Sequence, residues 1–241
     1  MRILVTGATS SLGRPLVPAL VGAGHDVVPA GRRTGFRLDM TADITLPDGI
    51  DALVHLASAT KGRDSAEVDV EGTRRLVAAA EQAGVRHLLY VSIVGVDRVP
   101  MRYFRHKLAA ERIVAAGAVP YTIFRATQFH EFLDDMLRRF LRFGLLVTDR
   151  RVAAQPVDKH DVVDRLVERV AAGPLGGIEE FGGPETLDAA AVARVRAPRA
   201  VIVPVRIPGR IGRALRAGGL TTTATPTGRR TFAAYVRGSR T

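Results

Sequence analysis

The sequence predicts an α/β protein whose core is a doubly wound parallel sheet with a small C-terminal lobe. Short β-rich apolar runs alternate with amphipathic segments of helical length, and a glycine-bearing turn follows the first run. The chain has 241 residues, of which 46% are hydrophobic and 24% charged, which suits one large domain with an appendage. Cysteine is absent, which excludes disulfides, thiol catalysis and cysteine-ligated metals, and we expect no metal.

The first half of the chain alternates strands with helices. Residues 2–6 form a β-rich run, and residues 12–23 carry a helix-spaced apolar face that ends at Gly24. Helices of this length between strands require crossover connections, so the strands should be parallel and covered on both faces. The further strands are expected at residues 26–30, 52–57, 87–92 and 121–125, with a short one from Phe36, and the further helices at residues 68–83 and 102–116.

The second half is less regular. We expect helices at residues 131–143 and 159–172, the second with Asp158 as its N-cap, and a strand at residues 178–181. Four prolines then break the chain into short pieces, which is typical of a small lobe. We therefore place the core in residues 1–157, and expect residues 158–241 to complete it and to form the lobe.

The net charge of +11 is concentrated at one end of the chain. Residues 1–188 contain 24 basic and 24 acidic side chains, whereas the rest contains 11 arginines and no acid. A solvated arginine-rich surface explains this excess, and an anionic ligand or partner is the alternative. We do not expect nucleic acid as a partner, because only Phe232 and Tyr235 accompany these arginines.

The apolar runs of this chain are short. They fall far below the roughly 20 residues that a membrane-spanning helix needs. The N-terminal residues lead directly into the first strand, without the apolar region of a secretory signal. We therefore expect a cytoplasmic protein that does not interact with a membrane.

The turn between the first strand and the first helix, residues 6–13, is the strongest local signal. Such a turn directs unpaired backbone N–H groups and the positive end of the helix dipole at one point, which suits a pyrophosphate. Gly7 permits the tight turn and Gly13 close helix packing, while Ser10 replaces a usual glycine and could donate its hydroxyl to a phosphate. A plain strand–helix turn is the alternative. The expected cofactor-binding residues of this turn are Gly7, Thr9, Ser10, Ser11, Leu12 and Gly13.

The end of the second strand bears on the choice of cofactor. An acidic residue there would bind the adenosine ribose, but Arg32 and Arg33 stand there instead, where a 2′-phosphate would lie. The sequence therefore favours NADP(H) over NAD(H), although two surface arginines are ordinary in an arginine-rich chain. Asp39 is a candidate for the adenine side. Leu56, Ala57 and Ser58 are candidates for contacts below the nicotinamide half. The alternative, for Asp39 and for this segment alike, is an ordinary loop.

Tyr103 and Lys107 lie four residues apart, on one face of a predicted helix. A nearby ammonium favours the phenolate and lowers the pKa of a tyrosine, so Tyr103 could exchange a proton with a substrate oxygen at neutral pH. Lys107 would also orient the cofactor ribose, and Ser92 could hydrogen-bond the same substrate oxygen. A surface pair that supports the helix is the alternative.

Together these residues resemble the short-chain dehydrogenase/reductase (SDR) superfamily, in its atypical NmrA-like NAD(P)-binding branch. The resemblance covers most of the chain and implies a Rossmann-like NAD(P)-binding domain with a small C-terminal substrate lobe. Ser10 departs from the pattern, and Ser92 lies nearer to Tyr103 than is usual. The residues that carry the resemblance are TGATSSLG at 6–13, Arg32 and Arg33, HLASAT from His55, DVEGTRRLVAAAEQAGVRHLLYVSIVGVD from Asp69, YFRHK from Tyr103 and VPYTIFRATQFHEF from Val119.

Residues 126–130 follow the carboxyl end of a strand, the edge where open α/β sheets bind ligands. We assign them to a substrate pocket, with Gln128 and His130 as polar contacts and Phe129 as a wall. The alternative for His130 is an ordinary histidine at a helix start. The resemblance adds residues 155–157 to the same region.

These observations lead to an NADPH-dependent oxidoreductase that acts on a carbonyl, a quinone or a similar small apolar substrate. Tyr103, Lys107 and Ser92 would be its catalytic residues. The resemblance leaves two alternatives: a non-catalytic NADP(H)-binding redox sensor that signals through a protein partner, and an epimerase or dehydratase of the nucleotide-sugar type. Helices that flank the sheet could pair two copies as a homodimer.

Overall fold

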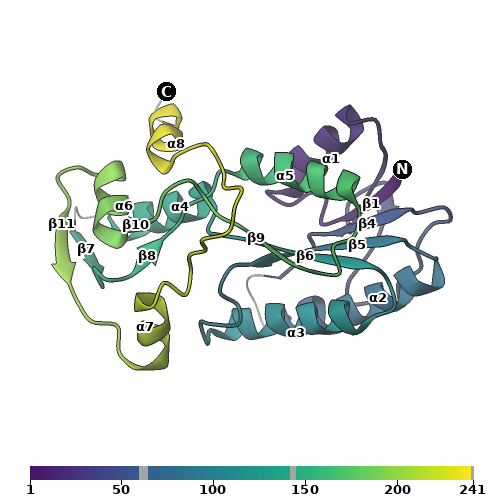
Figure 1. Cartoon of the computed structure of the whole chain (residues 1–241), viewed down its shortest axis with the longest axis horizontal. Helices are drawn as coiled ribbons and strands as arrows, with labels where there is room; N and C mark the ends of the chain where they lie inside the picture. Colours follow the sequence, from purple (N-terminus) through teal and green to yellow (C-terminus); the bar gives the residue numbers. More distant parts are fainter. Residues whose placement is uncertain (60–64, 142–144, 240–241) are drawn as a thin grey trace. The chain divides into compact units, whose positions relative to one another are not determined.

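The computed structural model describes residues 1–59, 65–141 and 145–239 (Figure 1). The chain forms two compact units. Unit 1 comprises Met1–Ser92, Arg102–Arg125 and Val163–Glu179, and unit 2 comprises Ile93–Met101, Ala126–Val162 and Glu180–Thr241. The predicted division at residue 157 stays a prediction.

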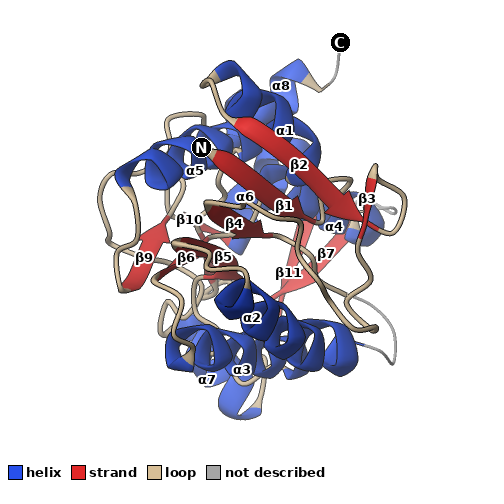
Figure 2. Ribbon diagram, turned by 90° about the vertical axis from the view of Figure 1, so that its right-hand side faces the viewer, coloured by secondary structure: helices blue, strands red, loops and turns tan. Residues whose placement is uncertain are grey.

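A seven-stranded sheet forms the centre of the fold, which confirms the predicted doubly wound arrangement (Figure 2). Its spatial order is β3-β2-β1-β4-β5-β6-β9, and β1 pairs in parallel with both β2 and β4. Leu4 of β1 faces Val28 on one side and Leu53 on the other. The strands are β1 (Arg2–Thr6), β2 (Asp26–Gly31), β3 (Phe36–Arg37), β4 (Ala52–His55), β5 (His87–Ile93), β6 (Tyr121–Ala126) and β9 (Gly177–Phe181).

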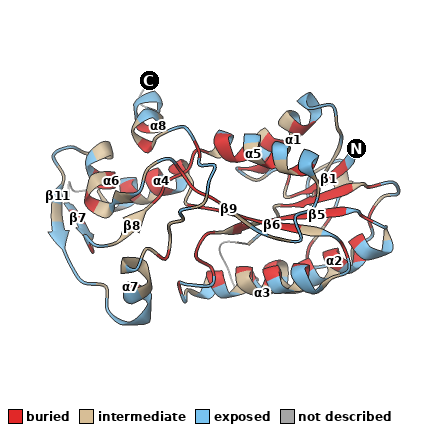
Figure 3. Ribbon diagram, viewed as in Figure 1, coloured by how far each residue is buried: buried red, intermediate tan, exposed pale blue. Residues whose placement is uncertain are grey.

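Helices cover both faces of this sheet. Helices α1 (Gly13–Gly22) and α5 (Lys159–Ala172) lie on one face, and α2 (Gly72–Gln82) and α3 (Arg102–Ala116) on the other (Figure 1). Because the sheet is covered twice, its central strands are continuous apolar runs, and Ile3–Val5 are fully buried (Figure 3). Burial of each such side chain contributes roughly 1.5–3 kcal/mol to stability.

The predicted boundaries differ from the observed ones in a few places. The strand expected at residues 52–57 ends at His55. The amide of Leu56 still donates to Thr6 O at 3.2 Å, but Thr6 Oγ1 also accepts it, and the amide of Ala57 donates to that hydroxyl. The helix expected at residues 68–83 begins as a π-helix, Glu67–Glu71, that continues into α2. The helix expected at residues 131–143 is α4 (His130–Phe140), and residues 142–143 lie outside the described residues.

Unit 2 has its own core, in which Leu133, Leu137, Leu146, Phe232 and Val236 pack together. Its strands form two small sheets: β7 (Leu145–Thr148) pairs in parallel with β11 (Val201–Pro204), and β8 (Ala153–Ala154) pairs antiparallel with β10 (Leu187–Asp188). The remaining helices are α6 (Ala189–Arg196), α7 (Gly209–Arg216) and α8 (Phe232–Gly238). Asp158 is the N-cap of α5, as predicted, since its Oδ1 accepts the amide of His160 at 2.8 Å.

Two histidines are buried in the sheet of unit 1. His55 Nδ1 lies 2.7 Å from Thr6 Oγ1 and its Nε2 lies 3.1 Å from Thr73 Oγ1, while His87 Nε2 lies 3.0 Å from Thr122 Oγ1. Burial lowers the pKa of His55 to about 3 and that of His87 to about 4, with smaller effects from Lys107 and Arg169 respectively. Both rings are therefore neutral in the folded chain at neutral pH.

This burial predicts that mild acid destabilises the fold. The unfolded chain takes up protons at these histidines below pH 6.5 and the folded chain does not, so stability falls as the pH falls. Between pH 7 and 5 we expect a loss of about 2 kcal/mol for each histidine, in a range where carboxylates are still ionised. Urea unfolding at several pH values measures this loss, and His87→Gln should halve it. A stability that does not change between pH 7 and 5 would contradict the prediction.

Candidate functional site

The order of the strands brings two loops together at the carboxyl edge of the sheet. The chain order reverses between β1 and β4, which is the point where open α/β sheets bind ligands. The loop after β1 contacts the segment after β4, since a Cβ placed on Gly7 would lie 2.8 Å from the Ala57 nitrogen. Residues 7–13 and 56–59 therefore form one site in unit 1.

The two predicted glycines are needed for this geometry. Gly7 has a φ of +66°, a conformation that favours glycine, and its Cα faces the backbone of Leu56 and Ala57. A Cβ on Gly13 would meet the carbonyl oxygens of Gly7 and Ala8, the second at 2.7 Å. Any side chain at either position would push the loop away from the strand ends.

The turn also offers unpaired donors. Ser10 N donates to Gly7 O at 2.9 Å, and Ser10 Oγ accepts the amide of Gly13 at 3.0 Å. The amides of Thr9, Ser11 and Leu12 have no hydrogen-bond acceptor among the described residues. These amides precede α1 directly, so the residues present fit a diphosphate. The hydroxyl hydrogen of Ser10 is not used in its contact with Gly13, so it can still serve as a donor.

The turn after β2 holds the two arginines that the sequence assigned to cofactor choice. Arg32 and Arg33 are exposed, and within the described parts of the chain neither has a hydrogen-bond or ion-pair partner. Asp39 Oδ1 accepts the amide and the hydroxyl of Thr41, at 3.0 and 2.8 Å. These bonds, with a smaller effect of Arg32, lower the pKa of Asp39. The roles of these three residues in binding stay predictions.

Tyr103 lies at the same edge, joined to the segment after β4. Its hydroxyl is 2.7 Å from Ser58 Oγ, and Ser58 Oγ donates to Asp69 Oδ1 at 2.6 Å. Asp69 Oδ2 accepts the amide of Ala59 at 3.2 Å. Helix α3 supplies the phenol, the strand end supplies Ser58, and the π-helix supplies Asp69, so three elements of unit 1 meet here.

Lys107 is buried beside this cluster, with only 4% of its surface exposed. Its Nζ donates to Val91 O at 2.8 Å and lies 4.1 Å from the centre of the Tyr90 ring. Burial lowers the pKa of Lys107 to about 8, partly offset by Asp69 and Glu111. The alternative of an exposed surface pair is therefore wrong for Lys107.

One expectation about this pair is also wrong. We expected Lys107 to lower the pKa of Tyr103, but burial raises that pKa to about 12, and the charge of Asp69 contributes to the increase. The physical reason is that the ammonium of Lys107 is directed at Val91 O and the Tyr90 ring. Ser92 is buried, and within the described residues its Oγ has no hydrogen-bond partner. That unpaired hydroxyl is consistent with a role in binding a substrate oxygen, which stays a prediction.

The predicted substrate residues lie in unit 2. Gln128 Nε2 donates to Leu220 O at 2.9 Å, and its Oε1 accepts the amide of Gln155 at 3.2 Å. Phe129 forms a bridge to Val157. The side-chain amide of Gln128 thus joins two other segments of unit 2, at Gln155 and Leu220. The substrate roles of Gln128, Phe129 and residues 155–157 stay predictions.

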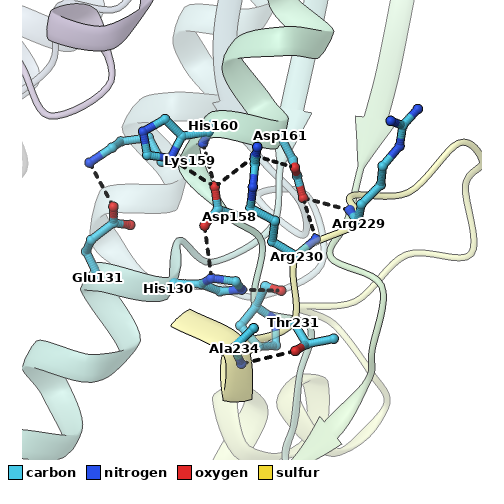
Figure 4. Close-up of polar contacts among 11 residues, drawn as sticks. His130, Glu131, Asp158, Lys159, His160, Asp161, Arg229, Arg230, Thr231 and Ala234 are labelled. Carbon is cyan, nitrogen blue, oxygen red and sulfur yellow. Dashed lines mark hydrogen bonds and ion pairs between the residues drawn. The ribbon is translucent and has the colours of Figure 1, made fainter. Parts of the chain in front are cut away.

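His130 has a well-defined structural environment in unit 2 (Figure 4). Its side chain is fully buried, its Nε2 lies 3.2 Å from Pro156 O, and its Nδ1 lies 3.6 Å from Asp158 Oδ2. The rings of Phe232 and Tyr235 pack against it. These contacts favour the alternative that His130 supports the start of α4.

Asp69 is a residue of the site that the sequence alone did not predict, although it begins one of the segments that carry the resemblance. A single acid at a helix start has many ordinary explanations, and only the fold brings it next to Ser58 and Tyr103. Thr6 was also missed. Its hydroxyl lies within hydrogen-bond distance of His55 and accepts the amides of Leu56 and Ala57, which fixes the strand end that presents Ser58.

Comparison with known families decides the class of the protein. A model described as NAD(P)H-binding matches residues 7–170, which is more than half of the chain. The chain belongs to the NAD(P)H-binding family. The match includes the glycine turn, Ser58, Asp69, Tyr103 and Lys107.

Two curated relatives of this NAD(P)H-binding protein have names that describe different roles. The chloroplast divinyl chlorophyllide a 8-vinyl-reductase of Oryza sativa subsp. indica is 28% identical and covers 76% of this chain and 54% of the reductase. The photosystem II assembly factor Ycf39 of Trieres chinensis is 24% identical and covers 67% of this chain and 57% of that factor. The chain therefore spans about half the length of these relatives.

A solved structure agrees in fold. The NADPH-dependent quinone oxidoreductase QOR2 of Escherichia coli, solved with NADPH, matches with a TM-score of 0.80 and 16% identity over 99% of this chain and 100% of that one. This likeness supports a Rossmann-like α/β fold for the chain. Within the described residues there is no helix long and apolar enough to span a membrane, and no group of three metal-ligating side chains.

The glycine geometry predicts different effects for two substitutions in α1. Gly13→Ala places a methyl group against the Gly7 and Ala8 carbonyls, so it should cost about 1–3 kcal/mol and weaken nucleotide binding. Gly22→Ala is the matched control, because nothing lies within 4 Å of its Cβ and it should gain up to about 1 kcal/mol. Urea unfolding and NADPH titration measure both effects. Equal stabilities of the two variants would contradict the close approach.

Proposed function

We propose that this protein is an NADP(H)-dependent oxidoreductase that reduces or oxidises a small carbonyl, quinone-like or alcohol substrate. One observation supports the proposal most: the 2.7 Å contact between Tyr103 and Ser58 puts a phenol at the strand edge where the glycine turn presents its free amides. A nucleotide held by those amides would extend along the same edge.

The nicotinamide, when bound, supplies or accepts the hydride. Tyr103 exchanges a proton with the substrate oxygen at Oη, and Ser92 hydrogen-bonds that oxygen with its unpaired hydroxyl. Lys107 orients the ribose through the donor hydrogens that its bond to Val91 O does not use. Burial of Lys107 and Ser92 removes competing water from these contacts.

The choice of NADP(H) is supported by the turn after β2. Arg32 and Arg33 are two exposed guanidinium groups without partners among the described residues, so they are available to a 2′-phosphate. The carboxylate of Asp39 is ionised and lies close enough to Arg32 to interact electrostatically. It would help to hold Arg32 in this turn.

Removal of Arg32 tests the cofactor choice. Arg32→Ala should raise the Kd for NADPH about tenfold, because one charge-assisted contact is worth roughly 1.5 kcal/mol, and change that for NADH less than about twofold. Arg112→Ala, an exposed arginine on α3, is the control and should change neither constant. Isothermal titration with both nucleotides gives the ratio. An unchanged ratio in Arg32→Ala would remove the basis for NADP(H).

Tyr103→Phe tests whether the site turns over. The variant should bind NADPH within about twofold of the natural chain and lose about 10²-fold or more of kcat with small ketones or quinones. Tyr121→Phe on β6 is the control and should keep both properties. Stopped assays of nicotinamide oxidation measure the rates.

Two other results would point to the alternatives. A natural chain that binds NADPH and turns over no ketone or quinone would be the redox sensor. Substrate conversion without net nicotinamide oxidation would indicate the epimerase or dehydratase.

A further inference from the structure

The carboxylate of Asp69 is placed as a functional group would be. It is 1% exposed and lies in the single π-helical turn Glu67–Glu71, a backbone distortion that is frequent at functional sites. Both of its oxygens accept hydrogen bonds, Oδ1 from Ser58 Oγ at 2.6 Å and Oδ2 from the amide of Ala59 at 3.2 Å. Asp69 is the acceptor in both bonds, so Ser58 Oγ is the donor in the bond to Oδ1.

This fixes the direction of every hydrogen bond in the cluster. Ser58 has one hydroxyl hydrogen, and Asp69 receives it. The 2.7 Å contact between Ser58 Oγ and Tyr103 Oη must then have the phenol as its donor. The phenol hydrogen is directed at Ser58, and the lone pairs of Oη are left to accept a proton from elsewhere.

Lys107 does not provide the same control. Its ammonium donates to Val91 O and lies over the Tyr90 ring. In the part of the chain that the structure describes, Ser58 is the hydrogen-bond partner of the Tyr103 hydroxyl. The charge of Asp69 acts on the same phenol, because it raises the pKa of Tyr103. Control of the phenol thus runs through Ser58 and Asp69.

We propose that Asp69 acts through Ser58 as a positioning residue for Tyr103 and as the end of a proton path Tyr103 Oη–Ser58 Oγ–Asp69 Oδ1. This inference rests on the proposed oxidoreductase function and names the source and destination of its proton. Asp69 and Ser58 do not touch the reacting carbon. They determine which way the phenol hydrogen points and where it goes.

The proton steps balance in both directions. In alcohol oxidation the hydroxyl proton of the substrate forms a bond to Tyr103 Oη, the phenol proton passes to Ser58 Oγ, and the Ser58 proton passes to Asp69 Oδ1. Three O–H bonds break and three form, while the hydride leaves with the oxidised nicotinamide cofactor. In carbonyl reduction the proton returns along the same atoms and ends on the substrate oxygen.

A purely structural carboxylate would leave part of this geometry unexplained. The bond from the Ala59 amide is enough to anchor the loop after β4, and it uses Oδ2 alone. The shorter bond from Ser58 uses the other oxygen and continues to Tyr103. An anchor does not need that continuation, whereas a proton path does.

The first test measures ionisation of Tyr103 and needs no turnover. The chain has four tyrosines and no tryptophan, so ultraviolet difference spectra report phenolate formation cleanly, and subtraction of Tyr103→Phe isolates this residue. Asp69→Asn should let Tyr103 ionise at lower pH than in the natural chain. Ser58→Ala should also let Tyr103 ionise at lower pH, because the phenol hydrogen loses the oxygen that accepts it and stabilises the neutral phenol. Glu71→Gln, an exposed acid of the same π-helix, should shift nothing.

The second test measures rates with NADPH and the best ketone or quinone found for the natural chain. Ser58→Ala and Asp69→Asn should each lower kcat about 10- to 100-fold with little change in KM, and displace the pH profile of kcat. Thermal melting shows whether Asp69→Asn is folded. If it is not, the rate of Ser58→Ala still tests the proton path, because Ser58 is exposed in a loop and its substitution should not unfold the chain.

The outcomes separate this proposal from the proposed function. Ionisation of Tyr103 at lower pH in both variants, together with lower kcat, would support the path. Unchanged ionisation in both variants would overturn it, even in an active enzyme. Shifted ionisation with full kcat would also overturn it, because the coupling would then have no role in proton transfer. A natural chain without turnover would defeat the proposed function, and the relay with it, whereas the ionisation shifts would still report on the coupling.

Discussion

The close approach of the first loop to the end of β4 is the constraint on which the site depends. Gly7 permits it because a Cβ there would meet the backbone of Leu56 and Ala57, and Gly13 lets the start of α1 lie against the carbonyls of Gly7 and Ala8. The buried hydroxyl of Thr6 completes it, since it accepts the amides of Leu56 and Ala57 just beyond the end of β4. The chain after β4 then passes directly under the nucleotide turn. Every later contact of the site starts from that position.

Because β4 ends where it does, Ser58 reaches the phenol of α3. The helix contributes Tyr103 at its first turn and Lys107 one turn later, so a single element supplies both groups. The hydroxyl of Tyr103 and the ammonium of Lys107 have different neighbours, however. The ammonium of Lys107 donates to the carbonyl of Val91 in β5, and the phenol of Tyr103 contacts Ser58 in the loop after β4. Helical spacing brought the two residues to one face without making them partners.

The sequence was informative where local physics decides the outcome. Alternating periodicity predicted the sheet and its helices, and the glycines predicted the tight turn before α1, whose role in nucleotide binding stays a prediction. Short elements of unit 2, such as β8 and β10, contain two residues each, too few for any periodicity. The role of Asp69 could not be predicted either, because its hydrogen bonds reach residues 10 and 11 positions away, and Ser58 is in turn 45 residues from Tyr103. Burial likewise decided the environments of Lys107 and His130, which spacing alone could not reveal.

Asp69 interacts electrostatically with both Tyr103 and Lys107. Its charge raises the pKa of both groups, which favours the neutral phenol at one and the ammonium at the other. Burial acts in the same direction on the phenol and in the opposite direction on the ammonium, so only Lys107 depends on nearby carboxylates to stay charged. Glu111 shares that task but is itself held by Arg125 in a buried pair. A proton that moved onto Asp69 would therefore weaken the support for the charge on Lys107, and this links the proton state of the phenol cluster to the charge of the buried lysine.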